Sequence, residues 1–167
     1  MSSAPILKNA LWLVLSLLIV LLDQWSKQSA SSALDYGRAL ELAPWLNFTL
    51  MHNEGAAFSF LSSAGGWQRW LFVAISSLVS LVIALWLLRL KANEKLMAVS
   101  LTFILGGALG NLWDRAVLGY VVDFISVHYH NRYFPTFNIA DAAISVGAAL
   151  MILDMFVNPE KSTAQRD

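Results

Sequence analysis

Four long apolar segments constrain the fold of this chain more than any other feature of its sequence. A helix needs about 20 residues to cross about 30 Å of hydrocarbon, and the segments predict helices at about 10–28, 69–89, 96–114 and 139–157. Hydrophobic residues make up 57% of the 167 residues and charged residues only 13%, which argues against an ordinary soluble domain. We therefore expect an all-α membrane protein with four transmembrane helices.

The first apolar segment allows two interpretations. Lys8, an apolar core and the small residues of "SASSAL" (29–34) together resemble a cleaved secretory signal. The polar residues Asp23, Gln24 and Lys27 stand between that core and the small residues, which is unusual for a signal peptide. They favour a first helix that is retained and continues through 23–28, with cleavage as the alternative.

Basic residues predict the orientation of the helices. The short connection between the second and third segments carries Arg89, Lys91 and Lys95. Because cytoplasmic loops are enriched in Lys and Arg, both termini are expected to be cytoplasmic, and the stretches 23–69 and 114–138 to face outward. Residues 1–157 would then form one integral membrane domain, followed by a disordered cytoplasmic tail at 158–167.

The outward stretch after the first segment is not all helical. The string "WLNFTLMHNEGAAFSFL" (45–61) begins with alternating residue types, continues through a turn-like "HNEG" (52–55) and ends in "AAFSFL". This pattern predicts a small outward-facing β-hairpin or sheet at about 40–62, at the membrane surface, with its apolar face on lipid or on a ligand. The other outward stretch, 116–136, is expected to form a loop over the site.

Polar residues at membrane depth gather at the outward ends of the predicted helices. The residues concerned are Asp23, Lys27, Asn111, Asp114, Arg115, Asp123, Asn138 and Asp141. A charged residue is unfavourable by roughly 2.5–3.5 kcal/mol at mid-membrane, and such residues usually face protein or water and have a function. Their convergence at one depth predicts a functional site there.

Asp123 and Asp141 could form a catalytic pair. Asp123 lies in "VVDFI" and Asp141 in "IADAAI", so both have apolar neighbours. Two carboxylates in a low-dielectric environment share a proton, which is how aspartic proteases activate water. The alternative is two unrelated residues, one in a loop and one near a helix N-terminus, where Asp is favoured. Asn138 is also ambiguous, because it can cap the last helix or face the site.

Other polar and small residues have structural interpretations that the sequence leaves open. Asp23 and Lys27 are four residues apart on one helix and are expected to pair in a structural role. Asp114 and Arg115 either form an interfacial ion pair or orient a carboxylate. The string "GGALG" (106–110) contains a Gly-x-x-x-Gly pattern, which indicates close helix packing.

Composition excludes several classes of function. The chain has no cysteine, so disulfides, thiol catalysis and cysteine-rich zinc sites are excluded, and its zero net charge gives no reason to expect nucleic-acid binding. His128 and His130 form only a weak metal-binding pattern, and no Gly-x-Ser-x-Gly string is present, so neither a metal site nor serine chemistry is expected. A small proton-coupled transporter and a non-catalytic membrane assembly module remain alternatives to a protease.

Five short strings, taken together and in order, carry a family resemblance. They are "DQWSK" (23–27), "NEGAAF" (53–58), "GNLWDR" (110–115), "VVDF" (121–124) and "FNIAD" (137–141). Each is weak alone, but their order, the chain length and the four apolar segments resemble the lipoprotein signal peptidases, also called signal peptidase II. The resemblance covers nearly the whole chain, with no departure at the motif positions.

The resemblance implies a membrane-embedded aspartic endopeptidase of the bacterial inner membrane, with its site near the periplasmic face. Such an enzyme removes the signal peptide from prolipoproteins by cleaving N-terminal to a diacylglyceryl-modified cysteine. Asp123 and Asp141 would be catalytic. Residues lining or supporting the site would be Asp23, Lys27, Asn53, Gly55, Gly107, Asn111, Asp114, Arg115, Asn138 and Ala140. The implied partners are lipid-modified prolipoproteins, membrane lipid and the peptide inhibitor globomycin, with no cofactor or metal. Four helices around one site also suggest a monomer.

Overall fold

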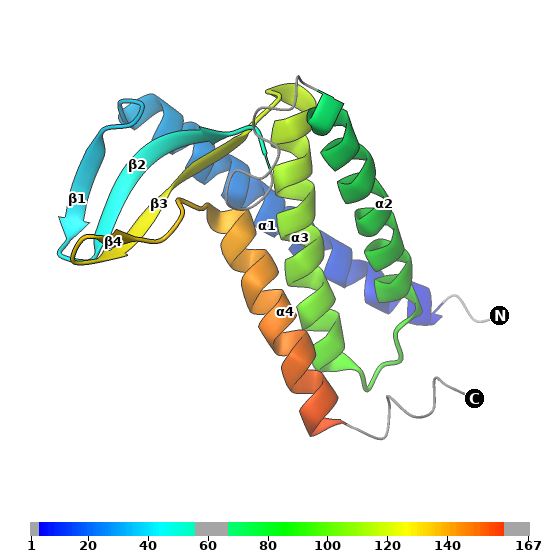
Figure 1. Ribbon diagram of the computed structural model, residues 1–167. Helices are drawn as coiled ribbons and strands as arrows, with labels where there is room; N and C mark the ends of the chain where they lie inside the picture. The colour runs from blue at the N-terminus through cyan, green and yellow to red at the C-terminus, as the bar shows by residue number, and fades with distance from the viewer. Residues whose placement is uncertain (1–3, 56–66, 159–167) are drawn as a thin grey trace.

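The computed structural model describes residues 4–55 and 67–158 of the chain, and these form a helical bundle with a small sheet at one end (Figure 1). The elements in order are α1 (Ala4–Ala33), β1 (Ala39–Ala43), β2 (Leu46–Asn53), α2 (Trp67–Arg89), α3 (Lys95–Val117), β3 (Val121–Tyr129), β4 (Arg132–Tyr133) and α4 (Ile139–Val157). Within the described residues, four helices are long and apolar enough to cross a membrane. The predicted architecture of four helices and a small sheet is confirmed. The predicted tail from 159 onward lies outside the described residues.

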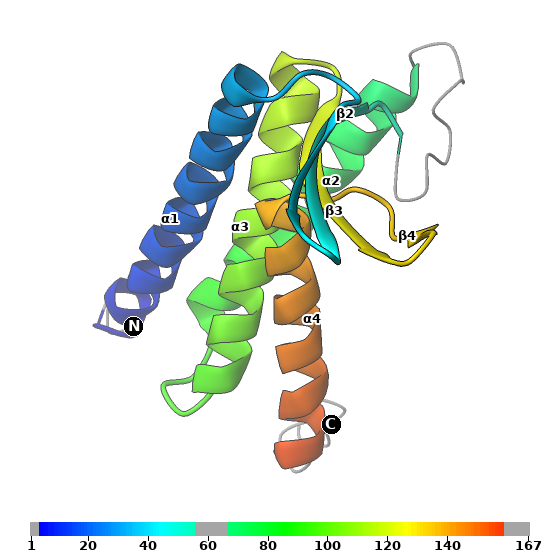
Figure 2. The ribbon, with the colours of Figure 1, turned by 90° about the vertical axis from the view of Figure 1, so that its left-hand side faces the viewer.

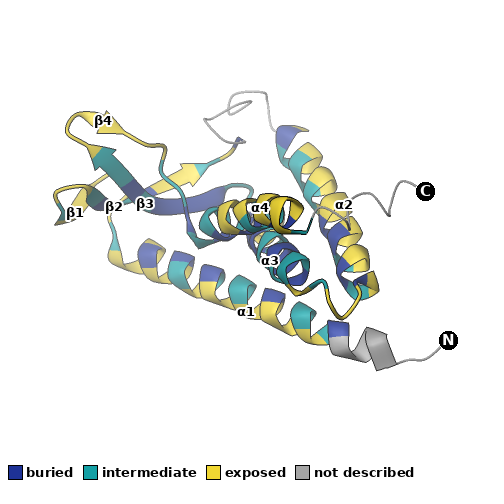
Figure 3. Cartoon of the chain, turned by 90° about the horizontal axis from the view of Figure 1, so that it is seen from below, coloured by how far each residue is buried: buried dark blue, intermediate teal, exposed yellow. Residues whose placement is uncertain are grey.

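Helix α3 is the central helix of the bundle. Half of its most apolar window is buried, against 11–22% for the corresponding windows of the other three helices. The outer faces of α1 and α2 carry exposed apolar side chains, as Figure 3 shows in yellow. Such faces suit hydrocarbon rather than water, so the burial pattern agrees with a bundle whose outer helices face lipid.

Glycines let α1 and α4 approach α3 closely. A Cβ atom on Gly106 would lie 2.7 Å from the Cβ of Ile19 in α1, and one on Gly147 would lie 2.7 Å from Cγ1 of Ile104. A Cβ on Gly107 would collide with the carbonyl oxygen of Ala140 at the start of α4. The close packing predicted from the Gly-x-x-x-Gly pattern is therefore confirmed, and it involves both α1 and α4.

The start of α1, the α2–α3 connection and the end of α4 lie at one end of the bundle, and the sheet lies at the other (Figure 2). At the first end, the side-chain amide of Asn9 donates to the carbonyl of Leu90 at 2.8 Å, joining α1 to the end of α2. The buried side chains there form an apolar cluster of α2 and α3, which includes Leu87, Leu101 and Leu105. This packing leaves the opposite ends of α1 and α2 free to diverge.

The sheet is antiparallel, with strand order β1-β2-β3-β4. Strands β2 and β3 pair from Leu46 with Val127 to Asn53 with Val121, with a bulge between Phe48 and Met51. The register places Met51 opposite Asp123, so β2 runs directly beside a predicted catalytic residue. The sheet therefore positions one half of the site.

Two details of the outward segments differ from the prediction. Strand β2 continues to Asn53, into the string "HNEG", and it pairs with β1 through a turn at 44–45; the segment expected to follow the turn at "HNEG", 56–61, lies outside the described residues. The stretch 116–136, predicted as a loop, contains β3 and β4. The first six residues of β3 are almost all buried, so the strand lacks the polar-apolar alternation by which a half-exposed strand is recognised.

Candidate active site

A cavity of ≈ 440 Å³ lies where α3, the start of α4 and the sheet meet. Its lining includes Asn53 from β2, Asn111 and Arg115 from α3, Asp123 from β3 and Asp141 from α4. Both predicted catalytic carboxylates thus face one cavity, although they belong to different elements. Apolar side chains, among them Val121, Phe134, Phe137 and Ile144, form much of the remaining wall.

Asp123 is held in the buried part of β3 by two amide side chains. It is 3% exposed, and its carboxylate accepts a hydrogen bond from Nδ2 of Asn138 at 2.6 Å and one from Nδ2 of Asn53 at 3.2 Å. Burial, followed by repulsion from the Asp141 carboxylate, raises the pKa of Asp123 to about 7. Near neutral pH this carboxyl group is therefore poised to hold or release a proton.

Asp141 occupies the first turn of α4, where it closes a capping box with Asn138. The Asn138 side chain accepts from the backbone N–H of Asp141 at 2.9 Å, and the Asp141 carboxylate accepts from the backbone N–H of Asn138 at 3.3 Å. Oδ1 of Asp141 also accepts from Nδ2 of Asn111 at 2.8 Å. The capping interpretation is confirmed for both residues, and it coexists with a place in the site.

The Asn138 side chain connects the Asp123 carboxylate to the backbone of Asp141. Its Oδ1 receives the backbone N–H of Asp141, while its Nδ2 donates to Oδ1 of Asp123. The side chain is fully buried, so both hydrogen bonds are shielded from water. One amide therefore fixes the position of Asp123 relative to the N-terminus of α4, which argues against two unrelated aspartates.

Beside the cavity, Lys27 of α1 joins its own helix to α3. Its Nζ atom lies 2.9 Å from Oδ2 of Asp23, 2.9 Å from Oδ2 of Asp114 and 2.9 Å from Oδ1 of Asn111, and its side chain is 3% exposed. A buried ammonium group is strongly unfavourable unless it is paired and hydrogen-bonded, and this one has both kinds of partner. The predicted Asp23–Lys27 pair is confirmed, and Asp114 is a second partner.

The two carboxylates that pair with Lys27 each hold the backbone beside a catalytic candidate. Oδ1 of Asp23 accepts the backbone N–H of Ala140 at 2.9 Å, and Oδ2 of Asp114 accepts the backbone N–H of Val122 at 3.1 Å. Ala140 precedes Asp141 and Val122 precedes Asp123. The Lys27 network thus positions both carboxylates through their neighbouring peptide groups.

Gly55 is held by two residues that line the cavity, Arg115 and Asn53. Nη2 of Arg115 donates to the carbonyl oxygen of Gly55 at 3.3 Å, and the backbone N–H of Gly55 donates to Oδ1 of Asn53 at 3.1 Å. Among the ion pairs of the described residues, Asp114 pairs with Lys27 and not with Arg115. The interfacial Asp114–Arg115 pair that the sequence allowed is therefore replaced by two separate sets of contacts.

All twelve predicted site residues lie in this region, and sequence reasoning missed one further participant. Nε2 of Gln24 lies 2.8 Å from Oδ1 of Asp114 and 3.2 Å from the carbonyl of Gly110. The sequence signal that could have identified Gln24 is its position: it is an amide residue directly after Asp23, at the end of an apolar segment. The catalytic and supporting roles of the twelve residues stay predictions.

The two histidines of the weak metal-binding pattern have other contacts. The ring of His128 stacks on Tyr133 at a centroid distance of 4.8 Å, and its Nδ1 lies 3.3 Å from the carbonyl of His130. In residues 4–55 and 67–158, no group of three or more His, Cys, Asp or Glu side chains is placed to hold a metal ion.

Comparisons with known proteins point to one family. A family model described as "Signal peptidase (SPase) II" matches residues 15–157. The chain is 51% identical over 158 residues to the lipoprotein signal peptidase of Acinetobacter baylyi, covering 95% of this chain and 88% of that protein. It is 54% identical over 148 residues to that of Acinetobacter baumannii, covering 89% and 84%.

Two solved structures, each described as a bacterial membrane enzyme, share the fold. One aligns with a TM-score of 0.80 at 28% identity and covers 91% of both chains. The other aligns with a TM-score of 0.77 at 29% identity, covering 89% of this chain and 94% of that one.

Proposed function

The chain belongs to the signal peptidase II family, and from that premise we propose that it cleaves prolipoproteins as an aspartic endopeptidase, with Asp123 and Asp141 as the catalytic pair. The family makes it a protease of a bacterial membrane with lipoprotein signal peptidase function. The proposal adds the catalytic type, the residues and the bond: the peptide bond N-terminal to a diacylglyceryl-modified cysteine.

The observation that carries the proposal is that Asp123 and Asp141 face one cavity and are connected through a single buried amide, that of Asn138. An aspartic mechanism needs two carboxylates close enough to share a proton and open to substrate and water on one side. The repulsion between the two carboxylates, which contributes to the raised pKa of Asp123, supports the first requirement, and the cavity that both line supports the second.

The environments of the two carboxylates suggest which one holds the proton. The pKa of Asp123, raised to about 7 by burial and by repulsion from Asp141, favours its protonated form at pH 6 to 7. Asp123 is therefore assigned as the general acid and Asp141 as the general base. Asp141 accepts hydrogen bonds from Asn111 and from the backbone of Asn138, which hold its oxygens in a fixed direction.

The reaction then proceeds in two proton-balanced steps. Asp141 takes a proton from a water molecule as the water oxygen attacks the scissile carbonyl carbon, and Asp123 gives its proton to the carbonyl oxygen. The tetrahedral intermediate returns its hydroxyl proton to Asp123 while the proton on Asp141 passes to the leaving nitrogen, and the C–N bond breaks. Both carboxyl groups recover their starting states.

The remaining predicted residues have supporting roles in this proposal. Asn53, Asn111 and Asn138 orient the two carboxylates, while Lys27, Asp23 and Asp114 hold the backbone that carries them. Close packing of Gly107 against Ala140 brings α3 and α4 together behind Asp141. Arg115 and Gly55 form the wall against which the substrate backbone would lie.

The position of the cavity agrees with a lipid-anchored substrate. It lies at the sheet end of the bundle, so a peptide whose signal segment crosses the membrane and whose cysteine carries lipid would present its scissile bond near the interface. By the distribution of basic residues, that interface is the periplasmic face of the inner membrane, and both termini are cytoplasmic. The proposed partners are lipid-modified prolipoproteins as substrates, membrane lipid, and globomycin as an inhibitor. The proposed enzyme is a monomer and uses no cofactor.

A gel-shift cleavage assay on a diacylglyceryl-modified prolipoprotein tests the function. Wild type should cleave it and leave the same precursor with an unmodified cysteine largely intact, while Asp123→Asn and Asp141→Asn should lose at least about 10³-fold in rate. Asp154→Asn is the matched control, because Asp154 is a buried aspartate at the other end of α4. Near-normal cleavage by either site variant would remove that residue from the catalytic pair.

A further inference from the structure

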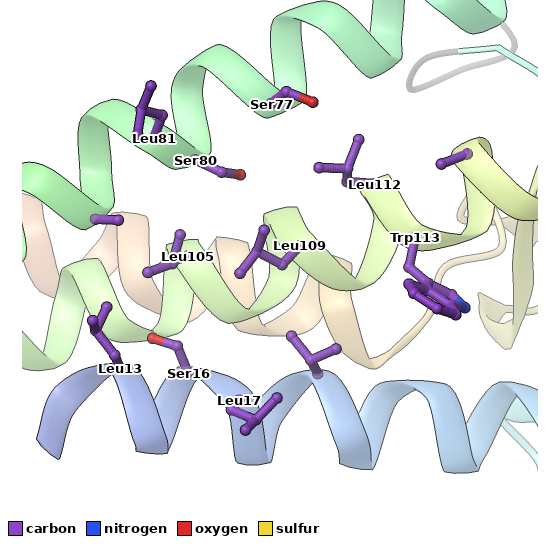
Figure 4. Close-up of a pocket in the computed structure, with 13 residues that line it drawn as sticks. Leu13, Ser16, Leu17, Ser77, Ser80, Leu81, Leu105, Leu109, Leu112 and Trp113 are labelled. Carbon is purple, nitrogen blue, oxygen red and sulfur yellow. The ribbon is translucent and has the colours of Figure 1, made fainter. Parts of the chain in front are cut away.

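A second cavity, of ≈ 560 Å³, lies between α1 and α2, with α3 as its floor (Figure 4). Its walls are mainly leucines, including Leu17, Leu109 and Leu112, with two serines of α2, Ser77 and Ser80. None of its lining residues lines the candidate active site, which lies between α3, α4 and the sheet. Its volume falls within the range of about 300–1,000 Å³ that is usual for small-molecule sites.

The length of this groove matches one membrane leaflet. Its floor on α3 runs from Leu105 to Ala116, which is about 16 Å at about 1.5 Å per residue. Half of the hydrocarbon thickness is about 15 Å. The inner end is closed by the apolar cluster in which Leu13 packs with Ile83 and Leu87. A transmembrane helix of a partner would need a groove as long as the full hydrocarbon thickness of the bilayer. The length of this groove therefore favours an acyl chain as its occupant.

Small side chains on α2 create the groove. Ser80 is 5% exposed and its hydroxyl has no hydrogen-bond partner among the described residues, so its contribution to the wall is its small size. Figure 4 shows the Ser77 and Ser80 side chains directed from α2 toward the space above α3, with Leu13, Ser16 and Leu17 opposite on α1. A larger residue at position 80 would fill the middle of the groove.

A positive charge stands at the end of the groove nearest the sheet. Arg69 lies on the same face of α2 as Ser80, three helical turns away, and its Nη2 donates to the carbonyl of Ala116 at 2.8 Å. Its Nε donates to the carbonyl of Arg115 at 2.9 Å, and its guanidinium carbon lies 5.0 Å from the centre of the Trp70 ring. Among the described residues Arg69 has no carboxylate partner, so its charge is available to an anion.

We propose that this groove is a binding site for one phospholipid, with an acyl chain lying between α1 and α2 and the phosphate beside Arg69. The groove opens along the lipid-facing surface of α1 and α2, so a chain can enter sideways from the bilayer. The charge at its mouth selects a phospholipid over diacylglycerol, which has the same chains and no phosphate. The site is separate from the catalytic cavity, and the proposal does not depend on the catalytic assignment.

Native mass spectrometry of the full-length protein in mild detergent, with added phosphatidylglycerol or dioleoylglycerol, tests the proposal. Wild type should retain one phosphatidylglycerol under activation that strips other lipids, and bind dioleoylglycerol at least about tenfold more weakly. Ser80→Phe should lower phosphatidylglycerol retention at least tenfold. Arg69→Gln should lower the affinity for phosphatidylglycerol while leaving that for dioleoylglycerol unchanged.

The control is Val82→Phe, which introduces the same phenyl ring on the exposed face of α2 and should behave as wild type. Thermal unfolding checks that Ser80→Phe is folded; if it is not, Ser77→Leu narrows the same groove and takes its place. If wild type and a folded groove variant retain phosphatidylglycerol equally, the groove is not the binding site. Equal binding of the two lipids, with no effect of Arg69→Gln, would overturn the phosphate assignment.

Discussion

At the scale of single residues, the arrangement depends on one buried cation. Lys27 lies between Asp23 and Asp114, and through them it holds the peptide groups that precede Asp141 and Asp123. The same ammonium group donates a hydrogen bond to the amide oxygen of Asn111, and the amide nitrogen of Asn111 donates to the Asp141 carboxylate. Loss of this charge would leave two buried carboxylates without compensation.

Lys27→Met should therefore be strongly destabilising. Removing one partner of a buried ion pair is unfavourable by about 3–5 kcal/mol, so the melting temperature should fall well below that of wild type and cleavage should decrease about 100-fold or more. Lys91→Met, at an exposed position, is the control. Thermal unfolding in detergent and the cleavage assay measure both effects. A variant with the wild-type melting temperature and rate would show that the network is dispensable.

The raised pKa of Asp123 predicts how stability depends on pH. The carboxyl group ionises near pH 4 in an unfolded chain, whereas burial raises its pKa to about 7 in the folded protein. Between these values the native state holds a proton that the unfolded state has released, so raising the pH lowers the free energy of unfolding, by up to about 1.4 kcal/mol per pH unit. An asparagine at position 123 has no carboxyl proton to release, so it removes this contribution to the pH dependence of stability.

The melting temperature of Asp123→Asn minus that of wild type should accordingly increase from pH 5 to pH 8. Thermal unfolding of both proteins in the same detergent, at four or more pH values, measures this difference. Asp154→Asn, far from the site on α4, provides the background. A difference that stays constant over this range would mean that Asp123 ionises as it does in an unfolded chain.

At the scale of elements, the contact of α3 with α4 sets the position of Asp141. Gly107 lies directly against the carbonyl of Ala140 and against Ile144, whose Cγ1 would be 2.8 Å from an added Cβ. The contact with Ala140 cannot be relieved by a change of side-chain rotamer, because it is made to the backbone. Any side chain at position 107 must therefore separate the two helices.

Gly107→Ala should displace Asp141 and lower both stability and rate. Overpacking of this kind is unfavourable by about 1–3 kcal/mol, and a shift of about 1 Å in a catalytic group can reduce a rate about 100-fold. Ala149→Val adds bulk on an exposed part of α4 and should change neither quantity. Melting temperature and cleavage rate are the measurements; unchanged values for Gly107→Ala would contradict the close packing.

The helices could be predicted from the sequence more fully than the strands. Four apolar segments gave the four helices within a few residues, except that α1 runs from Ala4 to Ala33 instead of about 10–28. Strand β3 was predicted as loop, because its burial on both faces removes the alternation of a half-exposed strand. The turn at 44–45 that joins β1 to β2 was not predicted, since the alternating string that indicated a strand begins only at Trp45.

At the scale of the whole molecule, most of the buried titratable residues in the helices lie at one end, and Asp154 is buried at the other. Asp23, Lys27, Asp114 and Arg115 lie near the sheet, whereas α2 is uncharged between Arg69 and Arg89. A proton-coupled transporter would require ionisable groups at several depths. Together with membership of a protease family, this distribution favours the protease over the transporter and over a passive assembly module.

The orientation predicted from basic residues can be tested with single cysteines, because the chain has none of its own. Leu40→Cys, on exposed β1, should react with a membrane-impermeant maleimide in intact cells with a permeabilised outer membrane. Ala92→Cys, in the α2–α3 connection, should react only after lysis. The opposite pattern would place the site on the cytoplasmic face and contradict the proposed access of substrate.

The membership of the site could be predicted from the sequence, whereas its geometry could not. Convergence at one depth and five short strings identified twelve residues, all of which lie in one region. The bridge through Asn138 and the partners of Lys27 depend on side-chain directions across different elements, which no spacing encodes; Lys27 and Asn111, for example, are 84 residues apart. The proton could be assigned to Asp123 only once its burial was known.

The most direct test of a shared proton is the pH dependence of single-turnover cleavage by the wild-type enzyme, under conditions in which chemistry limits the rate. One ionised and one protonated carboxyl group predict a bell-shaped profile, with the alkaline limb falling near pH 7 as Asp123 loses its proton. A rate that stays flat from pH 4 to 9 would contradict the two-aspartate mechanism.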